Sequence, residues 1–475
     1  MSPLPLLGLS TALLLFAGCV PKTDTALPMT LDEVNADLDK ELEGFDEVTL
    51  SEEWWKGLGD AQLNGIIAEA LRHAPSLKSL EARYVQAQSI IGSAQSHTLP
   101  SVSADGSVLR ERFSENHIFP APLGGSANTL YRPSLGMRYV FDFWNARASQ
   151  INAARNGAYA QRAYLAASRL ALESAICETY LAWNYDEKKR SVLHELEQTA
   201  LEELVIARRQ YALGLVSGME VRKREQKHAR VMQRLAAQEI AIEGWKKSLC
   251  VLAGFLPSRA SEFKTPDPAE YFHAPLPQEI VMDLLSRRPD IAVARYTLLS
   301  KHYRIEHARA QFYPNIVLSA NLGFTSFDRS SLFEYASATP GIALALSLPL
   351  FDGGEREANL RNAASDYNAS VYDYNEAVIH AANEVVGLLK QSAWLDEKIR
   401  FHHEELAMQA ANEEAERKRH LLGLSDKLPL LARKEEVLEG ELGSLELERD
   451  KGTLQIALIR ALGGGYRDDA APEGK

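Results

Sequence analysis

An internal duplication constrains this chain more than any other feature, because a tandem repeat defines the architecture before any single element is assigned. Motifs in the first half recur in the second half at an offset of 209–214 residues, and the match extends from residue 71 to residue 252. The first copy is expected over 61–260 and the second over 261–465. The aligned pairs are Pro75 with Pro289, Pro100 with Pro314, Asp142 with Asp352, Gly214 with Gly423, and Leu252 with Leu462.

Each copy is predicted to run in the same order: helix, two strands, long helix, short break, helix. Apolar and polar residues alternate over 102–108, 135–141, 316–324 and 342–350, which is typical of strands of about ten residues. Two segments, 145–213 and 355–422, contain no proline, so each is predicted to form one rod about 100 Å long. Heptads in the helices that follow the breaks indicate coiled-coil packing: Leu235, Ile242 and Leu249, and then Leu431, Leu438 and Leu445.

The number of predicted strands, four in each chain, indicates that the protein is an oligomer. After Cys19 no apolar stretch reaches the roughly 20 residues of a spanning helix, whereas strands of about ten residues can cross a membrane. Strands in lipid must close into a barrel, and barrels need at least about eight strands, which leave no open lumen. Three chains supply about twelve strands and a channel. The fold class is therefore predicted to be an α+β membrane protein whose trimer forms a 12-stranded transmembrane β-barrel, with loops 114–130 and 327–338 outside and helices turning at Gly214 and Gly423.

The N-terminal residues indicate export. Residues 3–20 are apolar, and Phe16-Ala17-Gly18-Cys19 resembles a bacterial lipobox. We expect a signal peptide over 1–18, a covalent lipid on Cys19, and a lipidated N-terminal segment with an equatorial region over 19–60. Phe replaces the usual Leu, and no Lys or Arg precedes Cys19, so a membrane anchor or an uncleaved signal is the alternative. Val20 after the cysteine favours the outer membrane.

Several functions are disfavoured by composition. A net charge of −12 without a basic cluster disfavours nucleic acid as a partner. The His402-His403 pair lacks metalloprotease spacing, the glycine runs lack the lysine of a phosphate loop, and no Gly-x-Ser-x-Gly motif occurs. We expect no enzyme activity and no cofactor apart from the lipid. Cys177 and Cys250 are predicted to be core residues, and 466–475 a disordered tail.

Six segments resemble the TolC-like outer membrane efflux factors, specifically the lipid-anchored branch that serves resistance-nodulation-division pumps. The resemblance spans roughly residues 50–465. It implies a homotrimer in the cell outer membrane, with a 12-helix α-barrel in the periplasm beneath the 12-stranded β-barrel. It also implies a periplasmic adaptor (membrane fusion) protein and an inner-membrane transporter as partners of a passive duct that exports small molecules. The segments are WWKGLGDAQL at 54–63, FDFW at 141–144, LLSRRPDI at 284–291, RAQFYPNIVLSA at 309–320, SLPLFDGGEREANL at 347–360 and HLLGLSD at 420–426.

The resemblance also places a gate at the periplasmic helix turns, where the family pattern is Arg-Tyr-x-x-Gly-Leu. We hypothesise that Arg419 and Asp426 make charge contacts that keep the resting tip closed; the alternative is that both are solvated charges. One exposed pair contributes only about 0–1 kcal/mol, so a closed gate needs several. Gln210 and His420 depart from the pattern, and the positions carried over are Tyr211, Gly214, Leu215, Arg419, Gly423 and Leu424, followed by Ser425 and Asp426.

Two other functions stay open at this point. A type I protein-secretion duct has the same fold and differs in cargo. A lipid-anchored coiled-coil scaffold without a pore belongs to another class and predicts no alternating strands.

Overall fold

The computed structural model describes residues 20–31, 34, 51–116, 118, 120–266 and 287–468. It contains two compact units. The first unit comprises 1–28, 83–161 and 294–374, and the second comprises 29–82, 162–293 and 375–475. Each unit therefore draws on both sequence copies. The copies expected over 61–260 and 261–465 both contribute to each unit, because elements of one copy pack against elements of the other, as β2 does with β3.

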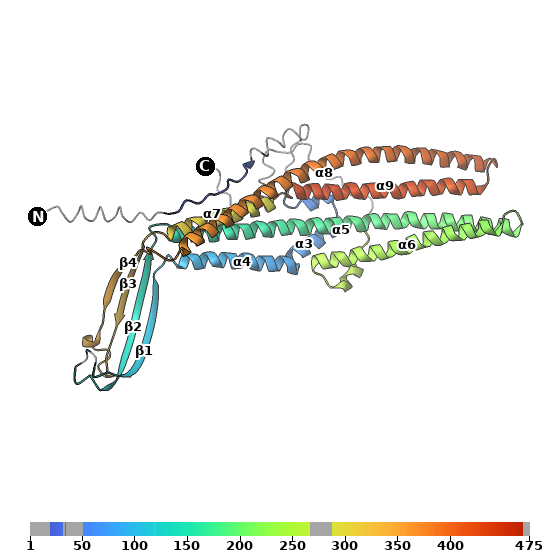
Figure 1. Cartoon of the computed structure of the whole chain (residues 1–475). Coiled ribbons are helices and arrows are strands. Elements are labelled where there is room, and N and C mark those ends of the chain that lie inside the picture. Colours follow the sequence, from blue (N-terminus) through green and yellow to red (C-terminus); the bar gives the residue numbers. More distant parts are fainter. Residues whose placement is uncertain are drawn as a thin grey trace. The chain divides into compact units, whose positions relative to one another are not determined.

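The first unit contains one antiparallel sheet with the strand order β1-β2-β3-β4 (Figure 1). In the described part of the chain, β1 and β4 each pair on one side only. We expected the last strand to reach residue 350, but it ends at Ser347, because Pro349 has no N–H group to donate to a ladder. The strands are β1 (Ser101–Arg112), β2 (Ala127–Phe141), β3 (Asn315–Gly323) and β4 (Gly341–Ser347).

The two faces of this sheet differ in chemistry. The strand register places Val102 opposite Met137, Leu135 opposite Leu322, and Leu318 opposite Leu344, so one apolar face continues across all four strands. The other face carries mainly small and polar side chains. Its members include Ser103, Asp105 and Ser107 of β1, Arg132, Ser134 and Arg138 of β2, Asn315, Ser319 and Asn321 of β3, and Ala343, Ala345 and Ser347 of β4. Large apolar side chains such as Ile342 and Leu344 are 78% and 69% exposed, so this chain alone does not cover the apolar face.

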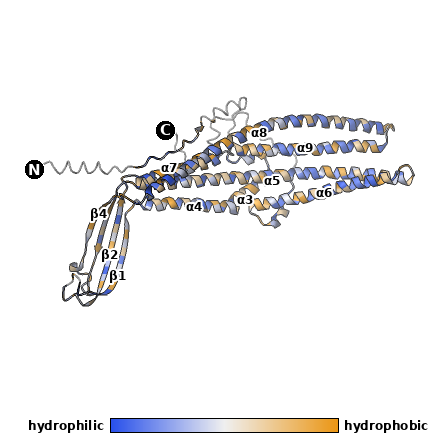
Figure 2. Ribbon diagram, in the orientation of Figure 1, coloured by the Kyte–Doolittle hydropathy of each residue, from blue (hydrophilic) through white to orange (hydrophobic). Residues whose placement is uncertain are grey.

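Long helices follow both pairs of strands, as predicted. The helices α5 (Ala146–Ala212) and α8 (Glu355–Leu421) each contain 67 residues, which corresponds to about 100 Å. Hydrophilic and hydrophobic residues interleave along them (Figure 2). No helix in the described ranges is both long and apolar enough to cross a membrane. The other helices are α3 (Ala61–His73), α4 (Pro75–Ser96), α6 (Gly218–Ala253), α7 (Pro289–Ala310) and α9 (Lys427–Ala461), with short 3-10 helices η1 (Trp54–Leu58), η2 (Pro257–Glu262) and η4 (Tyr335–Ser337).

An aspartate precedes each long helix in the first unit. Asp142 accepts hydrogen bonds from the backbone N–H groups of Arg147 and Ala148, at 3.0 and 2.8 Å. Asp352 accepts from the backbone N–H groups of Gly354 and Arg356, at 3.1 and 3.2 Å. Free N–H groups at a helix start favour a carboxylate there. The FDFW and LFDGG motifs therefore begin the two long helices in the same way.

The second unit has an aromatic core between α3, α5 and α6. Trp183 and Tyr180 are fully buried, and Trp54 and Trp55 pack into the same cluster from η1. Beside α7, the buried Arg288 donates to Asp290 and Glu384 and to the backbone carbonyl of Ala461. The arginine of the RRPDI motif thus joins the start of α7, the middle of α8 and the end of α9.

The end of the described chain corrects one expectation. Residues 466–468 were included in the disordered tail, yet Asp468 is packed, with a side chain that is 7% exposed and lies 3.2 Å from Arg162. An ion pair with a helix of the first copy fixes this residue. Residues 469–475 lie outside the described ranges.

Candidate functional site

Two helical hairpins of the second unit, α5/α6 and α8/α9, close in turns of the same geometry (Figure 1). Gly214 and Gly423 have φ values of +73° and +70°, a left-handed conformation that glycine adopts without steric cost. In the first turn, Gly214 N–H donates to Tyr211 and Leu215 N–H donates to Gln210, both at 2.9 Å. The second turn repeats this pattern between Gly423 and His420 and between Leu424 and Arg419. This pair of bonds satisfies carbonyl groups at a helix C-terminus.

The turns expose apolar side chains. Leu215 and Leu424, the predicted tip residues, are 70% and 68% exposed, and Tyr211 is 55% exposed. Leu213 and Leu422 beside them are also exposed. Each hairpin therefore presents leucines to solvent at its turn.

The structure places the charged residues predicted for the gate within one hairpin. The Arg419 guanidinium lies 3.2 Å from the Glu416 carboxylate, one turn earlier on α8. Ser425 also donates to Glu416 through its hydroxyl group, and His420 contacts the Ser425 carbonyl at 2.9 Å. Asp426 is the N-cap residue of α9, and its side chain makes no capping bond. Within a single chain, neither Arg419 nor Asp426 connects the two hairpins.

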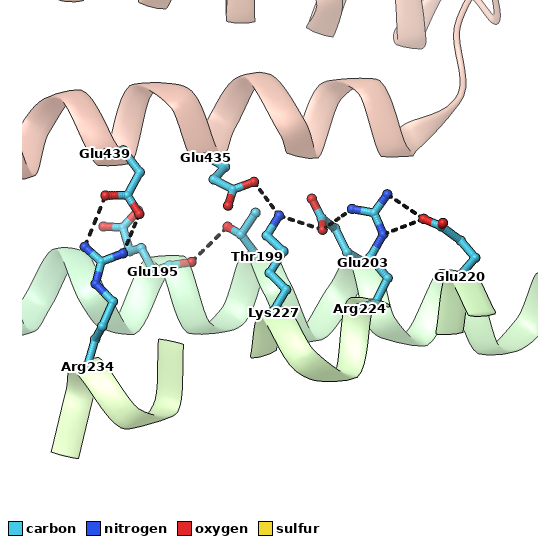
Figure 3. Close-up of polar contacts among 9 residues, drawn as sticks. All are labelled: Glu195, Thr199, Glu203, Glu220, Arg224, Lys227, Arg234, Glu435 and Glu439. Atoms are coloured by element: carbon cyan, nitrogen blue, oxygen red, sulfur yellow. Dashed lines mark hydrogen bonds and ion pairs between the residues drawn. The ribbon is translucent and has the colours of Figure 1, made fainter. Parts of the chain in front are cut away.

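Lys227, which pairs with the buried Glu203, connects the two hairpins instead, and the sequence did not reveal this contact (Figure 3). Glu203 on α5 accepts hydrogen bonds from Arg224 and Lys227 of α6, both at 2.7 Å. Lys227 also donates to Glu435 on α9. Arg224 pairs in addition with Glu220, at 3.1 Å. We call Glu203, Arg224, Lys227 and Glu435 the charged layer.

The charged layer continues an apolar seam. Leu196 of α5, Val231 of α6 and Leu442 of α9 belong to one buried cluster between these helices. One heptad nearer the turns, these three positions become Glu203, Arg224 and Glu435. Polar residues at coiled-coil core positions define the register and lower stability. The seam is therefore apolar away from the turns and charged close to them.

The ion pairs between these helices differ in burial, and burial determines how much free energy is lost when one partner is removed. The side chain of Glu203 is fully buried, while those of Lys227 and Glu435 are 24% and 30% exposed. Removing one partner from a buried pair costs about 3–5 kcal/mol, whereas an exposed pair contributes about 0–1 kcal/mol. The pair between Lys427 of α9 and Glu202 of α5 is of the exposed kind. Lys227 therefore links α9, through the partly exposed Glu435, to a fully buried carboxylate of α5.

One sequence signal could have revealed Glu203. On this helix Leu196, Ala200, Leu204 and Ala207 recur at spacings of three and four residues, which places them on one face. Glu203 lies seven residues after Leu196 and four before Ala207, so it shares their face. A carboxylate at that spacing predicts a buried charge with a cationic partner.

The metal-ligating side chains and the thiols of the described residues can be assessed directly. No group of three or more His, Cys, Asp or Glu side chains within these ranges could hold a metal ion. Cys177 and Cys250 are free and buried, and burial raises the pKa of both thiols. Neither thiol is therefore a ready nucleophile. Cys19, the predicted lipid attachment site, lies outside the described residues.

Comparison with known proteins agrees with this arrangement. Residues 66–243 and 280–464 match the outer membrane efflux protein family. The chain belongs to this family. It is 26% identical to the multidrug resistance outer membrane protein MdtQ of Escherichia coli O157:H7, over 83% of this chain and 84% of that protein. It is 29% identical to the fusaric acid resistance protein FusA of Burkholderia cepacia, over 73% of this chain and 67% of that protein.

Solved structures show the same fold. The outer membrane protein VceC of Vibrio cholerae superposes with a TM-score of 0.81 at 28% identity, covering 88% of this chain and all of that one. The CmeC outer membrane channel of Campylobacter jejuni gives a TM-score of 0.83 at 20% identity, covering 95% and 96%. The predicted family and its function as the outer-membrane channel component of an efflux pump are confirmed. This is a transport family rather than an enzyme family.

Proposed function

We propose that three copies of this chain form a passive duct that exports small molecules, with a 12-stranded β-barrel in the outer membrane and a 12-helix α-barrel in the periplasm. One observation carries the proposal: a four-stranded sheet with one apolar face, one polar face and single-sided pairing of β1 and β4. Unpaired edges are not tolerated in lipid, so β4 of one copy pairs with β1 of the next. The apolar face then contacts lipid and the polar face lines the water-filled lumen.

The gate of this duct lies at the two helical turns. In the closed state the charged layer holds α9 against α5 and α6 in each protomer, and Arg419 and Asp426 contribute contacts at the tip. Charged groups gain hydration when helices separate, so this layer opens at a lower cost than the apolar layer of Leu196, Val231 and Leu442. Opening therefore starts at the turns and stops where the seam becomes apolar.

The N-terminus anchors each copy to the outer membrane through lipid on Cys19, after removal of the signal peptide 1–18. Contacts of residues 20–31 support this proposal. The Ala26 N–H group donates to Asn368 at 2.8 Å, and Asn368 donates back to the Asp24 carbonyl at 3.1 Å. Val20 packs beside Ile305 and Leu360. The segment that follows Cys19 is thus held against α7 and α8 in the first unit.

The partners are a periplasmic adaptor protein and an inner-membrane resistance-nodulation-division transporter, which supplies the energy. Exposed Leu215 and Leu424 give each turn an apolar surface that water solvates poorly. We assign these turns as the adaptor contact. The duct itself carries out no chemistry.

The proposal is tested by planar-bilayer conductance of the detergent-purified protein, with its mass determined in parallel. We expect a trimer with small or absent conductance that increases when Lys227 is replaced by Met, or when Arg419 and Asp426 are replaced by Ala. A monomer or dimer without conductance in every variant would refute the duct.

A further inference from the structure

Two arginines continue the apolar face of the sheet at its hairpin end. Along β1, the residues on this face are Val102, Ala104, Gly106 and Val108, followed by Arg110 and Arg112. Both arginines are exposed. A charge on a lipid-facing row is costly within hydrocarbon, and the cost falls to about 0–1 kcal/mol near the interface. Their place in the row therefore indicates the depth of the membrane surface.

A third arginine reaches the same face from the loop after β3. The Nε–H group of Arg329 donates to the Tyr131 hydroxyl at 2.8 Å, and its guanidinium lies 5.3 Å from the centre of the Tyr131 ring. Tyr131 is opposite Val108 in the register, and Arg110 is opposite Thr129. Arg110 is thus a diagonal neighbour of Tyr131, at a typical distance of about 7–8 Å. Arg110 and Arg329 both lie next to this tyrosine.

Aromatic residues define the height of the lipid band. Tyr139 and Phe141 form an edge-to-face pair at the helix end of β2, with ring centres 5.0 Å apart, and Tyr131 occupies the same face at the hairpin end. Ten residues of strand span about 34 Å, or about 26 Å at a tilt of about 40°. A lipid band of about 25 Å between two aromatic girdles is characteristic of outer-membrane barrels. Arg110 and Arg329 lie just beyond this band, on the side away from the helices.

The guanidinium groups of Arg110 and Arg329 are not paired with the acidic side chains near them. Glu115 lies 3.6 Å from Arg112, which also donates a hydrogen bond to the Gly125 carbonyl. Arg112 is therefore already paired with the loop that follows β1. The Asp328 carboxylate accepts from the Ser330 side chain. Within the described ranges neither Arg110 nor Arg329 makes an ion pair, and Arg329 contacts Tyr131 through a hydrogen bond and its ring.

We propose that Arg110 and Arg329, with Tyr131 between them, bind the phosphate groups of lipid A in the outer leaflet of the outer membrane. This inference rests on the proposed barrel. A guanidinium group donates two parallel hydrogen bonds to a phosphate, and a partly desolvated site strengthens them. The hairpin end of the sheet is opposite to the end from which the helices leave for the periplasm, which selects the outer leaflet. The site supplies a boundary lipid to each protomer.

The test is a titration of the detergent-purified protein with fluorescent bisphosphorylated lipid A and, in parallel, with its dephosphorylated form. We expect the variant R110Q/R329Q to raise the Kd for bisphosphorylated lipid A about tenfold or more. Dephosphorylated lipid A should bind the parent and the variant equally weakly. The matched control is R132Q/R138Q, which removes two arginines from the opposite face of the same sheet and should leave the Kd unchanged.

Equal affinity of R110Q/R329Q and the parent would overturn the proposal, as would an equal loss in R132Q/R138Q. The single variant R110Q removes no described ion pair, and it carries the same test with a smaller loss if the double variant does not assemble. Conductance of each protein is measured first. A monomer or dimer without conductance in every variant, the tip variants included, would refute the duct, whereas a conducting R110Q/R329Q with unchanged lipid A binding would refute this inference alone.

Discussion

The ammonium group of Lys227 lies 2.7 Å from the carboxylate of Glu203, whose side chain is completely buried. Lys227 also reaches Glu435, so one side chain of α6 joins α5 to α9. Two predictions separate the contribution of this lysine from that of the buried acid.

We expect Lys227→Met to loosen the closed tip. Glu203 then keeps only Arg224, and Glu435 loses its partner. A hydrogen bond to a charged group contributes about 1.5–3 kcal/mol, so the open fraction should rise markedly in single-channel recordings. The control is Lys427→Met, which removes the exposed pair with Glu202 and should change the recordings little. An equal change in open fraction for Lys227→Met and Lys427→Met would show that burial of the ion pair does not determine its contribution to the closed tip.

We expect Glu203→Leu to do the opposite. Leucine continues the seam from Leu196, and replacement of a buried ion network by apolar residues is often neutral or stabilising by about 1–4 kcal/mol. Arg224 retains Glu220, and Lys227 retains Glu435. The midpoint of thermal unfolding should stay the same or rise, and conductance should stay low. A lower midpoint with higher conductance would show that Glu203 itself closes the tip.

Close packing between α8 and α9 gives a third prediction. A Cβ atom added at Gly443 would lie 2.9 Å from the His402 ring, which is held by a contact of 2.8 Å between its Nε2 atom and the Gly440 carbonyl. Gly443→Ala should therefore lower the thermal midpoint, because overpacking costs about 1–3 kcal/mol and exceeds the helix-propensity gain. Gly387→Ala in α8 meets no atom within 4 Å and should raise stability by up to about 1 kcal/mol. A stabilising Gly443→Ala would mean that the helices separate easily here.

The fourth prediction concerns pH. Burial raises the pKa of Glu173 from 4.5 to about 8, although the charge of Arg169 opposes the shift. The folded state then holds a proton that the unfolded chain releases above pH 4.5. The contribution of protonated Glu173 to the free energy of unfolding is complete below pH 4.5. It decreases by about 1.4 kcal/mol per pH unit between the two pKa values and is lost above pH 8. Thermal midpoints measured from pH 5 to pH 8.5 should fall for the parent and show a weaker dependence for Glu173→Gln. Identical slopes would assign the pH dependence to other groups.

The sequence predicted those features that repeat with a fixed period. The alternation of Ile316 and Leu318 defined a strand face, and the absence of proline defined α5 and α8 to within one residue at each end. Duplication gave the turns at Gly214 and Gly423, because both copies need a residue that tolerates positive φ.

Features that depend on the packing of distant segments were not predictable in this way. The composition of the two compact units follows from pairing between the copies, such as β2 with β3, which no local pattern encodes. Prediction of the charged layer would have required knowing which helices pack against Glu203. The core position of Trp54 and Trp55 likewise depends on Trp183, more than a hundred residues away.

The single-sided pairing of β1 and β4 has a consequence for biogenesis. In water, solvent satisfies the open N–H and C=O groups of an edge, but in lipid each unsatisfied group costs several kcal/mol. In the barrel proposed above, an isolated copy would therefore have no complete membrane-embedded state of its own. We then expect insertion and association to occur as one concerted event, and the yield of finished channels to increase more steeply than in proportion to the amount of chain delivered to the membrane.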